Sequence, residues 1–126
     1  MRKSTKMAVG VDIIEIERIK RATTDHREAF LNRIYTKAEL DCTSSRPDGL
    51  AVRFAAKEAV MKTLGTGIGG IRWKDIEILN SVDGAPVIKL YGRACDKAKE
   101  LGLENFSISL SHCKTHAIAM VIGYAG

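Results

Sequence analysis

The segment that most constrains the fold is Arg53–Lys62, RFAAKEAVMK, which has the composition of a helix interior but carries charges among its apolar residues. With about 100° between successive residues, Phe54 and Met61 belong to one apolar stripe, and Glu58 lies only about 40° from Phe54. An unpaired buried carboxylate costs several kcal/mol. Glu58 therefore predicts a metal, a partner or a polar cleft beside this helix.

The same residues allow a purely structural interpretation. Glu58 and Lys62 stand in the favourable i,i+4 order, and such a pair on a solvated face stabilises a helix by only about 0.3 to 0.5 kcal/mol. The helix alone does not decide between a surface ion pair and a functional site.

The length of 126 residues predicts a single domain over 1–126, with residues 1–6 as a short basic extension. No apolar run approaches the roughly 20 residues of a membrane helix, so we expect no membrane association. The widely spaced Cys42, Cys95 and Cys113 lack the spacing of a zinc site and favour a reducing, cytoplasmic location.

The formal net charge of +5 favours an acidic partner, which includes nucleic acid, a phosphorylated small molecule, an anionic surface or an acidic protein. Arg18, Lys20 and Arg21 lie on a predicted helix over 15–23 and form either a basic patch or an ordinary solvated face. Because no aromatic residues alternate with these cations, they give little support for single-stranded nucleic acid.

A strand is predicted over 7–14 from its alternating pattern. Asp12 falls on the face with Ala8, Gly10 and Ile14, and these small neighbours predict open space in front of its carboxylate. Asp12 is either a functional carboxylate or a cap for the helix that follows.

The remaining pattern alternates short helices and strands. Thr36–Glu39 fits a capping box that opens a helix ending near Cys42, and Asp48 is a candidate N-cap for the long helix, which stops at Gly65. The later segments are predicted strands over 73–79 and 86–90, a helix over 93–101, and strands over 106–111 and 117–122 with His112 at the turn between them. The expected fold is α+β, with a mostly antiparallel sheet packed against the long helix.

The glycine-rich connector Gly65–Gly70 follows a helix and is not followed by Gly-Lys-Ser/Thr, so it is not a Walker loop. Its backbone permits close approach to a ligand, but a helix stop followed by a plain loop explains it equally well.

Taken together, these motifs resemble the holo-acyl carrier protein synthase family, the small phosphopantetheinyl transferases. The resemblance runs in order from residue 7 onward through Gly10-Val11-Asp12-Ile13, Arg18-Ile19, Thr36-Lys37-Ala38-Glu39-Leu40, Arg53-Phe54-Ala55-Ala56-Lys57-Glu58-Ala59, Lys62, Gly65-Thr66-Gly67, Trp73-Lys74-Asp75-Ile76-Glu77-Ile78, Gly84-Ala85-Pro86 and Ser109-Leu110-Ser111-His112.

The resemblance implies a phosphopantetheinyl transferase-like fold and transfer of the phosphopantetheine arm of coenzyme A to a serine of apo-acyl carrier protein, in support of fatty acid biosynthesis. It implies a magnesium ion held by Asp12 and Glu58, with Lys62 as the third catalytic residue. Magnesium prefers oxygen ligands, one or two of them carboxylates, completed by water and phosphate. Glu58 is also a candidate to orient a water or to deprotonate the serine.

By the same resemblance, the coenzyme A-binding residues are Arg53, Lys57, Gly67 and His112. Arg18 and Arg21 match the positions where the family docks its acidic carrier protein, and the family is commonly a homotrimer. Two departures are Cys113, where relatives often carry a polar or acidic residue, and the extra residues before Met7.

Two other functions compete with the transferase. A non-enzymatic basic module for nucleic acid is disfavoured, because Asp12 and Glu58 would repel phosphates without a metal. A magnesium-dependent phosphohydrolase would use the same carboxylates but would not account for the Gly-Thr-Gly and Ser-His motifs together.

Overall fold

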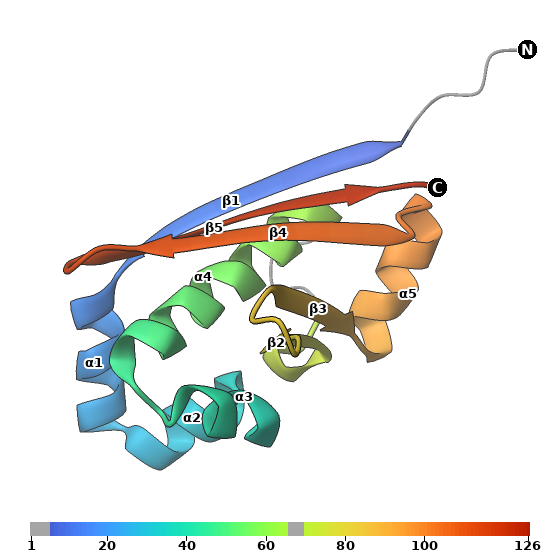
Figure 1. The fold of residues 1–126 in the computed structure, drawn as a ribbon. Coiled ribbons are helices and arrows are strands. Elements are labelled where there is room, and N and C mark those ends of the chain that lie inside the picture. The colour runs from blue at the N-terminus through green and yellow to red at the C-terminus, as the bar shows by residue number, and fades with distance from the viewer. Residues whose placement is uncertain (1–5, 66–69) are drawn as a thin grey trace, which may run out of the picture.

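The computed structural model describes residues 6–65 and 70–126. In chain order the elements are β1 (Met7–Glu15), α1 (Ile16–Asp25), α2 (Arg27–Ile34), α3 (Lys37–Thr43), α4 (Pro47–Leu64), the 3-10 turn η1 (Trp73–Asp75), β2 (Ile76–Asn80), β3 (Pro86–Leu90), α5 (Gly92–Leu101), β4 (Asn105–His112) and β5 (His116–Tyr124) (Figure 1). The α+β expectation is confirmed.

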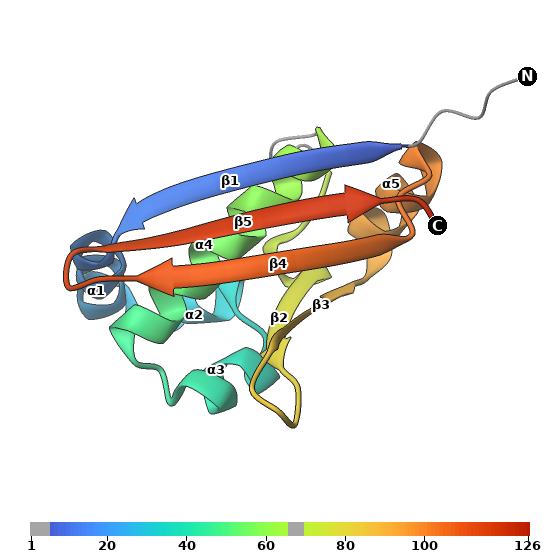
Figure 2. The ribbon, with the colours of Figure 1, turned by 45° about the horizontal axis from the view of Figure 1, so that its top comes forward.

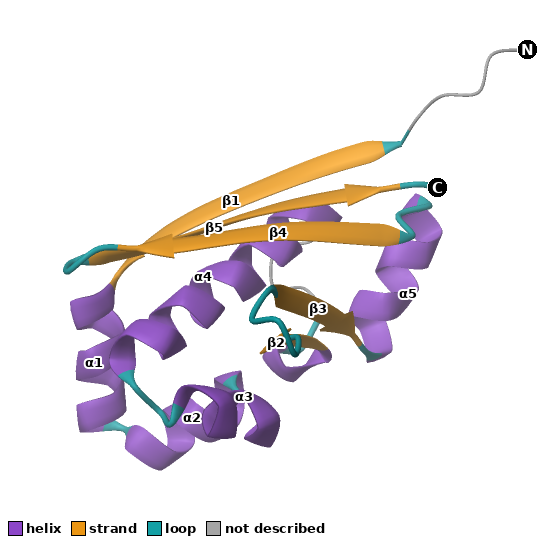
Figure 3. Ribbon diagram, in the orientation of Figure 1, coloured by secondary structure: helices purple, strands orange, loops and turns teal. Residues whose placement is uncertain are grey.

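Two antiparallel sheets frame the long helix. The larger sheet has the strand order β1-β5-β4, and the smaller one pairs β2 with β3. Figure 2 shows α4 running beneath the three long strands, and Figure 3 shows the helices gathered on that one side. The opposite face of the larger sheet carries no described element.

The helix α4 is enclosed on nearly all sides. From Leu50 to Leu64 every side chain is buried except Phe54, Glu58 and Lys62. The expectation of a single apolar stripe is therefore wrong, because the sheet covers one side of α4 while α3 and β2 contact others. The three exceptions are spaced four residues apart and form one accessible row along the helix.

Close contact between β1 and α4 depends on Gly10. A Cβ atom at this position would lie 2.0 Å from the Ala59 carbonyl oxygen and 2.5 Å from Thr63 Oγ1. The strand can lie against the helix only because residue 10 has no side chain. The sequence predicted open space in front of Asp12, next to its small neighbours on β1. The structure shows instead that α4 fills this space.

The predicted local structure is largely confirmed, with some differences. The capping box is present: Glu39 N donates to Thr36 Oγ1 at 3.2 Å, and Thr36 N donates to Glu39 Oε1 at 2.9 Å. Asp48 is not the N-cap of α4, because the helix begins at Pro47, and Asp48 lies in its first turn, where a negative charge is favourable.

Two segments differ from the sequence prediction. The helix α2 was not predicted, because its eight residues bury only Leu31 and Ile34 and show little periodicity. Trp73–Asp75 forms a 3-10 turn rather than the start of a strand, since Asp75 N donates to Arg72 O and the Asp75 carboxylate accepts from Arg72 N. Within the described ranges, no helix is both long enough and apolar enough to span a bilayer.

We predict that Gly10→Ala destabilises the protein by about 3 kcal/mol or more, because the new methyl group would overlap the Ala59 carbonyl. Urea unfolding measures the change. Gly49→Ala is the matched control, because its Cβ would meet only the Thr43 side chain, at 3.1 Å. Equal stability of Gly10→Ala and the wild type would show that the helix and strand are not in close contact.

Candidate active site

The accessible row of α4 meets β1 at Asp12. Lys62 Nζ donates to Asp12 Oδ1 and to the Val11 carbonyl oxygen, both at 3.0 Å. Asp12 does not cap the following helix, since the N-cap of α1 is Glu15. Lys62 thus forms its ion pair with Asp12 on β1. In the described part of the chain, it forms no ion pair with Glu58 on its own helix.

The environment of Glu58 is unfavourable for a negative charge. Burial raises the pKa of Glu58, and the Asp12 carboxylate raises it further, while Lys62 and Arg18 act in the opposite direction. The four side chains are therefore within electrostatic reach of one another. The structure brings together the three predicted catalytic residues and one of the two predicted carrier-binding arginines.

Asp12 and Glu58 form a donor set that fits a hard divalent cation. Two carboxylates that repel each other at the edge of a helix are stabilised by a cation between them. Among the described residues, no group of three or more His, Cys, Asp or Glu side chains gathers in one place. Two carboxylates suffice for magnesium, which keeps several waters and takes other oxygens from substrate phosphates.

Arg53 is buried but retains one weakly held donor. Its Nε donates to Ile78 O at 3.0 Å and its Nη1 to Gly49 O at 3.4 Å, while Nη2 donates to Cys42 Sγ at 3.3 Å. Because a thiol is a weak acceptor, an anion that reaches this edge of the guanidinium would be a better partner than Cys42.

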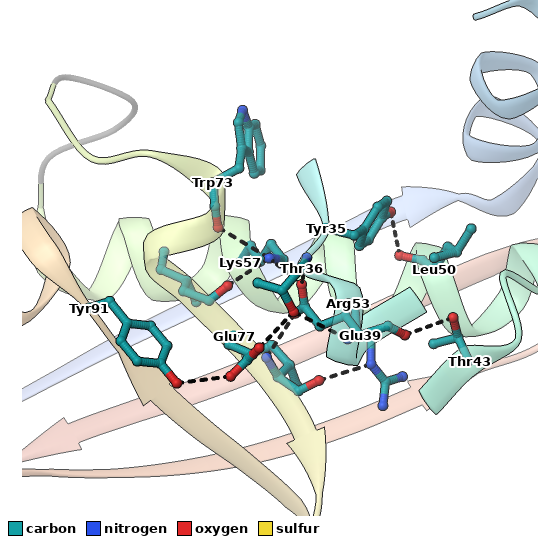
Figure 4. Close-up of polar contacts among 12 residues, drawn as sticks. Tyr35, Thr36, Glu39, Thr43, Leu50, Arg53, Lys57, Trp73, Glu77 and Tyr91 are labelled. Atoms are coloured by element: carbon teal, nitrogen blue, oxygen red, sulfur yellow. Dashed lines mark hydrogen bonds and ion pairs between the residues drawn. The ribbon is translucent and has the colours of Figure 1, made fainter. Parts of the chain in front are cut away.

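Lys57 lies in a different environment from the one predicted. Its side chain is fully buried, with Nζ 2.7 Å from Glu39 Oε1 and donating to Trp73 O at 3.1 Å and Ile76 O at 2.6 Å (Figure 4). Burial lowers the pKa of Lys57, and Glu39 opposes that shift. All three ammonium protons are engaged, which contradicts the expectation that Lys57 contacts coenzyme A.

His112 ends β4, as expected for a residue at the turn, and lies on the side of the sheet that faces α4. Its Nε2 is 3.7 Å from Asp48 Oδ2. The two residues line a depression of about 660 Å³ between the β4–β5 turn and the starts of α1 and α4, and this lining does not include Asp12, Glu58 or Lys62. Gly67 lies outside the described residues.

An aromatic cluster that the sequence did not predict lies along the accessible row. The Phe54 ring stacks on Trp73 at a centroid distance of 4.9 Å and on Phe30 at 6.4 Å. The three rings line a depression of about 390 Å³, and Arg33 lines both this depression and a neighbouring one. The sequence signal that could have indicated this cluster was the i,i+4 spacing of Phe54 and Glu58, which places the Phe54 ring one turn from Glu58 on the same face of the helix.

Comparison with known proteins defines the class. Residues 8–121 match the 4'-phosphopantetheinyl transferase superfamily. The chain is 53% identical over 113 residues to a holo-[acyl-carrier-protein] synthase of Dehalococcoides mccartyi, covering 90% of this chain and 94% of the relative. It is 46% identical over 119 residues to that of Natranaerobius thermophilus, covering 92% and 95%.

Solved structures agree. The holo-[acyl-carrier-protein] synthase of Helicobacter pylori, in complex with coenzyme A, superposes with a TM-score of 0.84 at 33% identity, covering 91% of this chain and 98% of that one. The holo-(acyl-carrier-protein) synthase of Bacillus anthracis superposes with a TM-score of 0.80 at 30% identity, covering 98% of this chain and 100% of that one. The chain belongs to the 4'-phosphopantetheinyl transferase superfamily. Within it, the relatives named above are all holo-[acyl-carrier-protein] synthases.

We predict that Glu58→Gln raises the free energy of unfolding at neutral pH. Because the folded state raises the pKa of Glu58, its contribution to stability is complete below the unfolded pKa, about 4.3, and is lost as pH rises through the folded pKa. Glutamine does not ionise and avoids this loss. Thermal unfolding of both proteins between pH 4 and pH 8 measures the effect.

The gain should vanish at the acid end of this range, where both side chains are neutral. A variant that is less stable than the wild type at pH 7 would contradict the electrostatic description of Glu58.

Proposed function

We propose that this protein transfers the phosphopantetheine arm of coenzyme A to a serine of apo-acyl carrier protein. The serine oxygen attacks the phosphorus that carries the arm, the bond from that phosphorus to the bridging oxygen breaks, and adenosine 3',5'-bisphosphate leaves with this oxygen. The observation that carries the proposal is the meeting of Asp12, Glu58 and Lys62 on one edge of α4 in a chain of this family.

Asp12 and Glu58 are the residues that would hold a magnesium ion. When bound, magnesium would neutralise negative charge on the pyrophosphate, which is the main demand of a phosphate-transfer transition state. The raised pKa of Glu58 supports this role, because a carboxylate that is unfavourable without a cation gains most from binding one.

Lys62 supplies a positive charge next to the same carboxylates. Its exposed ammonium can turn from Asp12 toward a substrate phosphate, where it acts as a point cation. Glu58, whose pKa is raised by burial and by Asp12, is the candidate to accept the serine proton. Metal ligation and proton acceptance by Glu58 remain alternative roles in this proposal.

Coenzyme A would contact Arg53 through its Nη2 edge and His112 at the end of β4, with Gly67 proposed from the family resemblance alone. Lys57 is no longer part of this set. His112 and Asp12 lie on the same α4-facing side of the larger sheet, on strands β4 and β1, which β5 separates. A coenzyme A site shared between neighbouring subunits is proposed from the family resemblance.

The carrier protein is proposed to dock on the exposed face of α1 through Arg18 and Arg21. An acidic partner matches these cations, and such complementary charges mainly raise the association rate. The neighbouring aromatic depression formed by Phe30, Phe54 and Trp73, with Arg33 at its side, supports an adjoining apolar contact with the same partner. The aromatic depression begins at Phe54, one helical turn from Glu58.

We predict that the purified protein converts apo-carrier protein to the holo form with coenzyme A and magnesium, and that Asp12→Asn and Glu58→Gln each lower the rate by at least about 100-fold, as expected for loss of a charge that stabilises the transition state. Intact-protein mass spectrometry measures the product. Lys89→Gln, on the exposed strand β3, is the control. An unmodified carrier with wild-type enzyme would refute the proposal.

A homotrimer is supported by the uncovered face of the larger sheet. Met7, Val9, Val11 and Ile13 on β1 point away from α4, and Ile118 and Met120 on β5 extend the same surface, with 39% to 67% of each residue exposed. A continuous apolar surface of this kind on a small protein marks an interface. Association through it would place the site of one subunit beside the next.

We predict that the wild-type protein sediments as a trimer of the 13.8 kDa chain and that Val11→Lys shifts it to the monomer. The new charge lies on the exposed apolar face, so folding should survive while burial against another subunit becomes costly. Analytical ultracentrifugation measures the mass. Val82→Lys, at the fully exposed β2–β3 turn, is the control. A monomeric wild type would overturn this assembly.

We also infer a cytoplasmic location and a role in fatty acid biosynthesis, both of which follow from the proposed reaction. The free thiols of Cys42, Cys95 and Cys113 are compatible with a reducing compartment.

A further inference from the structure

The smaller sheet leaves one edge of β2 without a strand partner. Tyr91 N donates to Asp75 O at 2.8 Å, and Ile76 is opposite Leu90 in the register. Because antiparallel pairs alternate between bonded and non-bonded residues, Glu77 faces β3, whereas the backbone groups of Ile76 and Ile78 face the free edge. These outward groups are buried and require partners.

Three side chains supply partners for the two carbonyl oxygens and the Ile78 N–H, while the Ile76 N–H donates to Trp73 O. Lys57 Nζ donates to Ile76 O at 2.6 Å, Glu39 Oε2 accepts from Ile78 N at 2.8 Å, and Arg53 Nε donates to Ile78 O at 3.0 Å. The bonds lie one after another along the strand, in the positions that a third strand would occupy (Figure 4). Glu39 and Lys57 also form an ion pair at 2.7 Å, so the three groups are linked.

We propose that Glu39, Lys57 and Arg53 substitute for a third strand along β2, and that Glu39 and Lys57 are thereby positioning residues for coenzyme A binding. The second part rests on the proposed transfer reaction. Glu39 and Lys57 are fully buried, and they act by holding the backbone that accepts the Arg53 hydrogen bond.

Two hydrogen bonds to Ile78 connect Glu39 with Arg53. Glu39 holds the N–H of Ile78, and Arg53 Nε binds the carbonyl oxygen of the same residue. The direction of the Arg53 guanidinium, and so the place of its Nη2 edge, depends on where Ile78 lies. Displacement of β2 leaves Arg53 without the acceptor that orients it for an anion.

Charged side chains suit this task because each reaches the edge from a helix. Lys57 and Arg53 extend from one side of α4, one turn apart, and Glu39 extends from α3, where its other oxygen closes the capping box. Removal of one member of a buried ion pair leaves an uncompensated charge, whereas removal of both does not. The double variant Glu39→Leu/Lys57→Met therefore separates lost edge contacts from a buried charge.

The first test measures hydrogen exchange in the double variant. The amide of Ile78 should exchange at least about 10-fold faster than in the wild type, because its acceptor is gone, while the Lys89 amide, in the β2–β3 ladder, stays protected. This readout does not depend on enzymatic activity. Unchanged protection of Ile78 would overturn the strand-substitute assignment whether or not the protein is a transferase.

The second test measures steady-state kinetics with coenzyme A and apo-carrier protein. The double variant should raise the KM for coenzyme A about 10-fold or more, because one charge-assisted hydrogen bond to coenzyme A loses its orientation. The kcat and the KM for the carrier protein should stay within about two-fold of the wild-type values. Glu39→Gln/Lys57→Met, which keeps one acceptor oxygen for the Ile78 N–H and leaves no unpaired ammonium, should recover part of the loss.

Tyr35→Phe is the matched control, since it removes an equally buried hydrogen bond, from Tyr35 Oη to Leu50 O at 2.8 Å, that does not touch β2. It should lower stability without raising the KM for coenzyme A. Equal increases of both KM values in the double variant, or the same coenzyme A effect in Tyr35→Phe, would refute a positioning role. Inactivity of the wild type would instead refute the proposed reaction.

Discussion

The contact between β1 and α4 at Gly10 is the constraint on which the rest of the structure depends. A strand can lie this close to a helix only where one residue lacks a side chain, and the contact fixes the height of Asp12 along α4. From it follow the pairing of Asp12 with Lys62 and the electrostatic influence of Asp12 on Glu58. The chemistry proposed for this protein thus begins with backbone packing rather than with the charged groups themselves.

The helix α4 separates two kinds of charged residue. Its accessible row carries Glu58 and Lys62 toward β1 and solvent, while Arg53 and Lys57 point inward to the free edge of β2. One segment of ten residues therefore supplies both the proposed reactive groups and internal hydrogen bonds. This division explains why charges are frequent in a helix that is otherwise buried.

The sequence was sufficient to predict the fold class and the capping box, and the family resemblance selected Asp12, Glu58 and Lys62, which lie together at the edge of α4. The fold class and the capping box depend on local patterns, whereas Asp12 and Lys62 are 50 residues apart in the chain and were connected only by the family resemblance. The role of Lys57 was not predictable, because it is set by contacts with Trp73 and Ile76, 16 and 19 residues away. The uncovered apolar face was also missed, since alternation in β1 does not tell which face meets the helix.

The register of the larger sheet has a consequence for synthesis of the chain. The first strand is paired along its whole length with the last, from Met7 opposite Tyr124 to Glu15 opposite His116, and β5 lies between β1 and β4. While the ribosome is still making the final strand, β1 has no place in a sheet, and Asp12 cannot be held beside α4. Because β1 needs β5 for its pairing, β1 joins the sheet late in folding, and Asp12 reaches its place beside α4 only after β5 has been made.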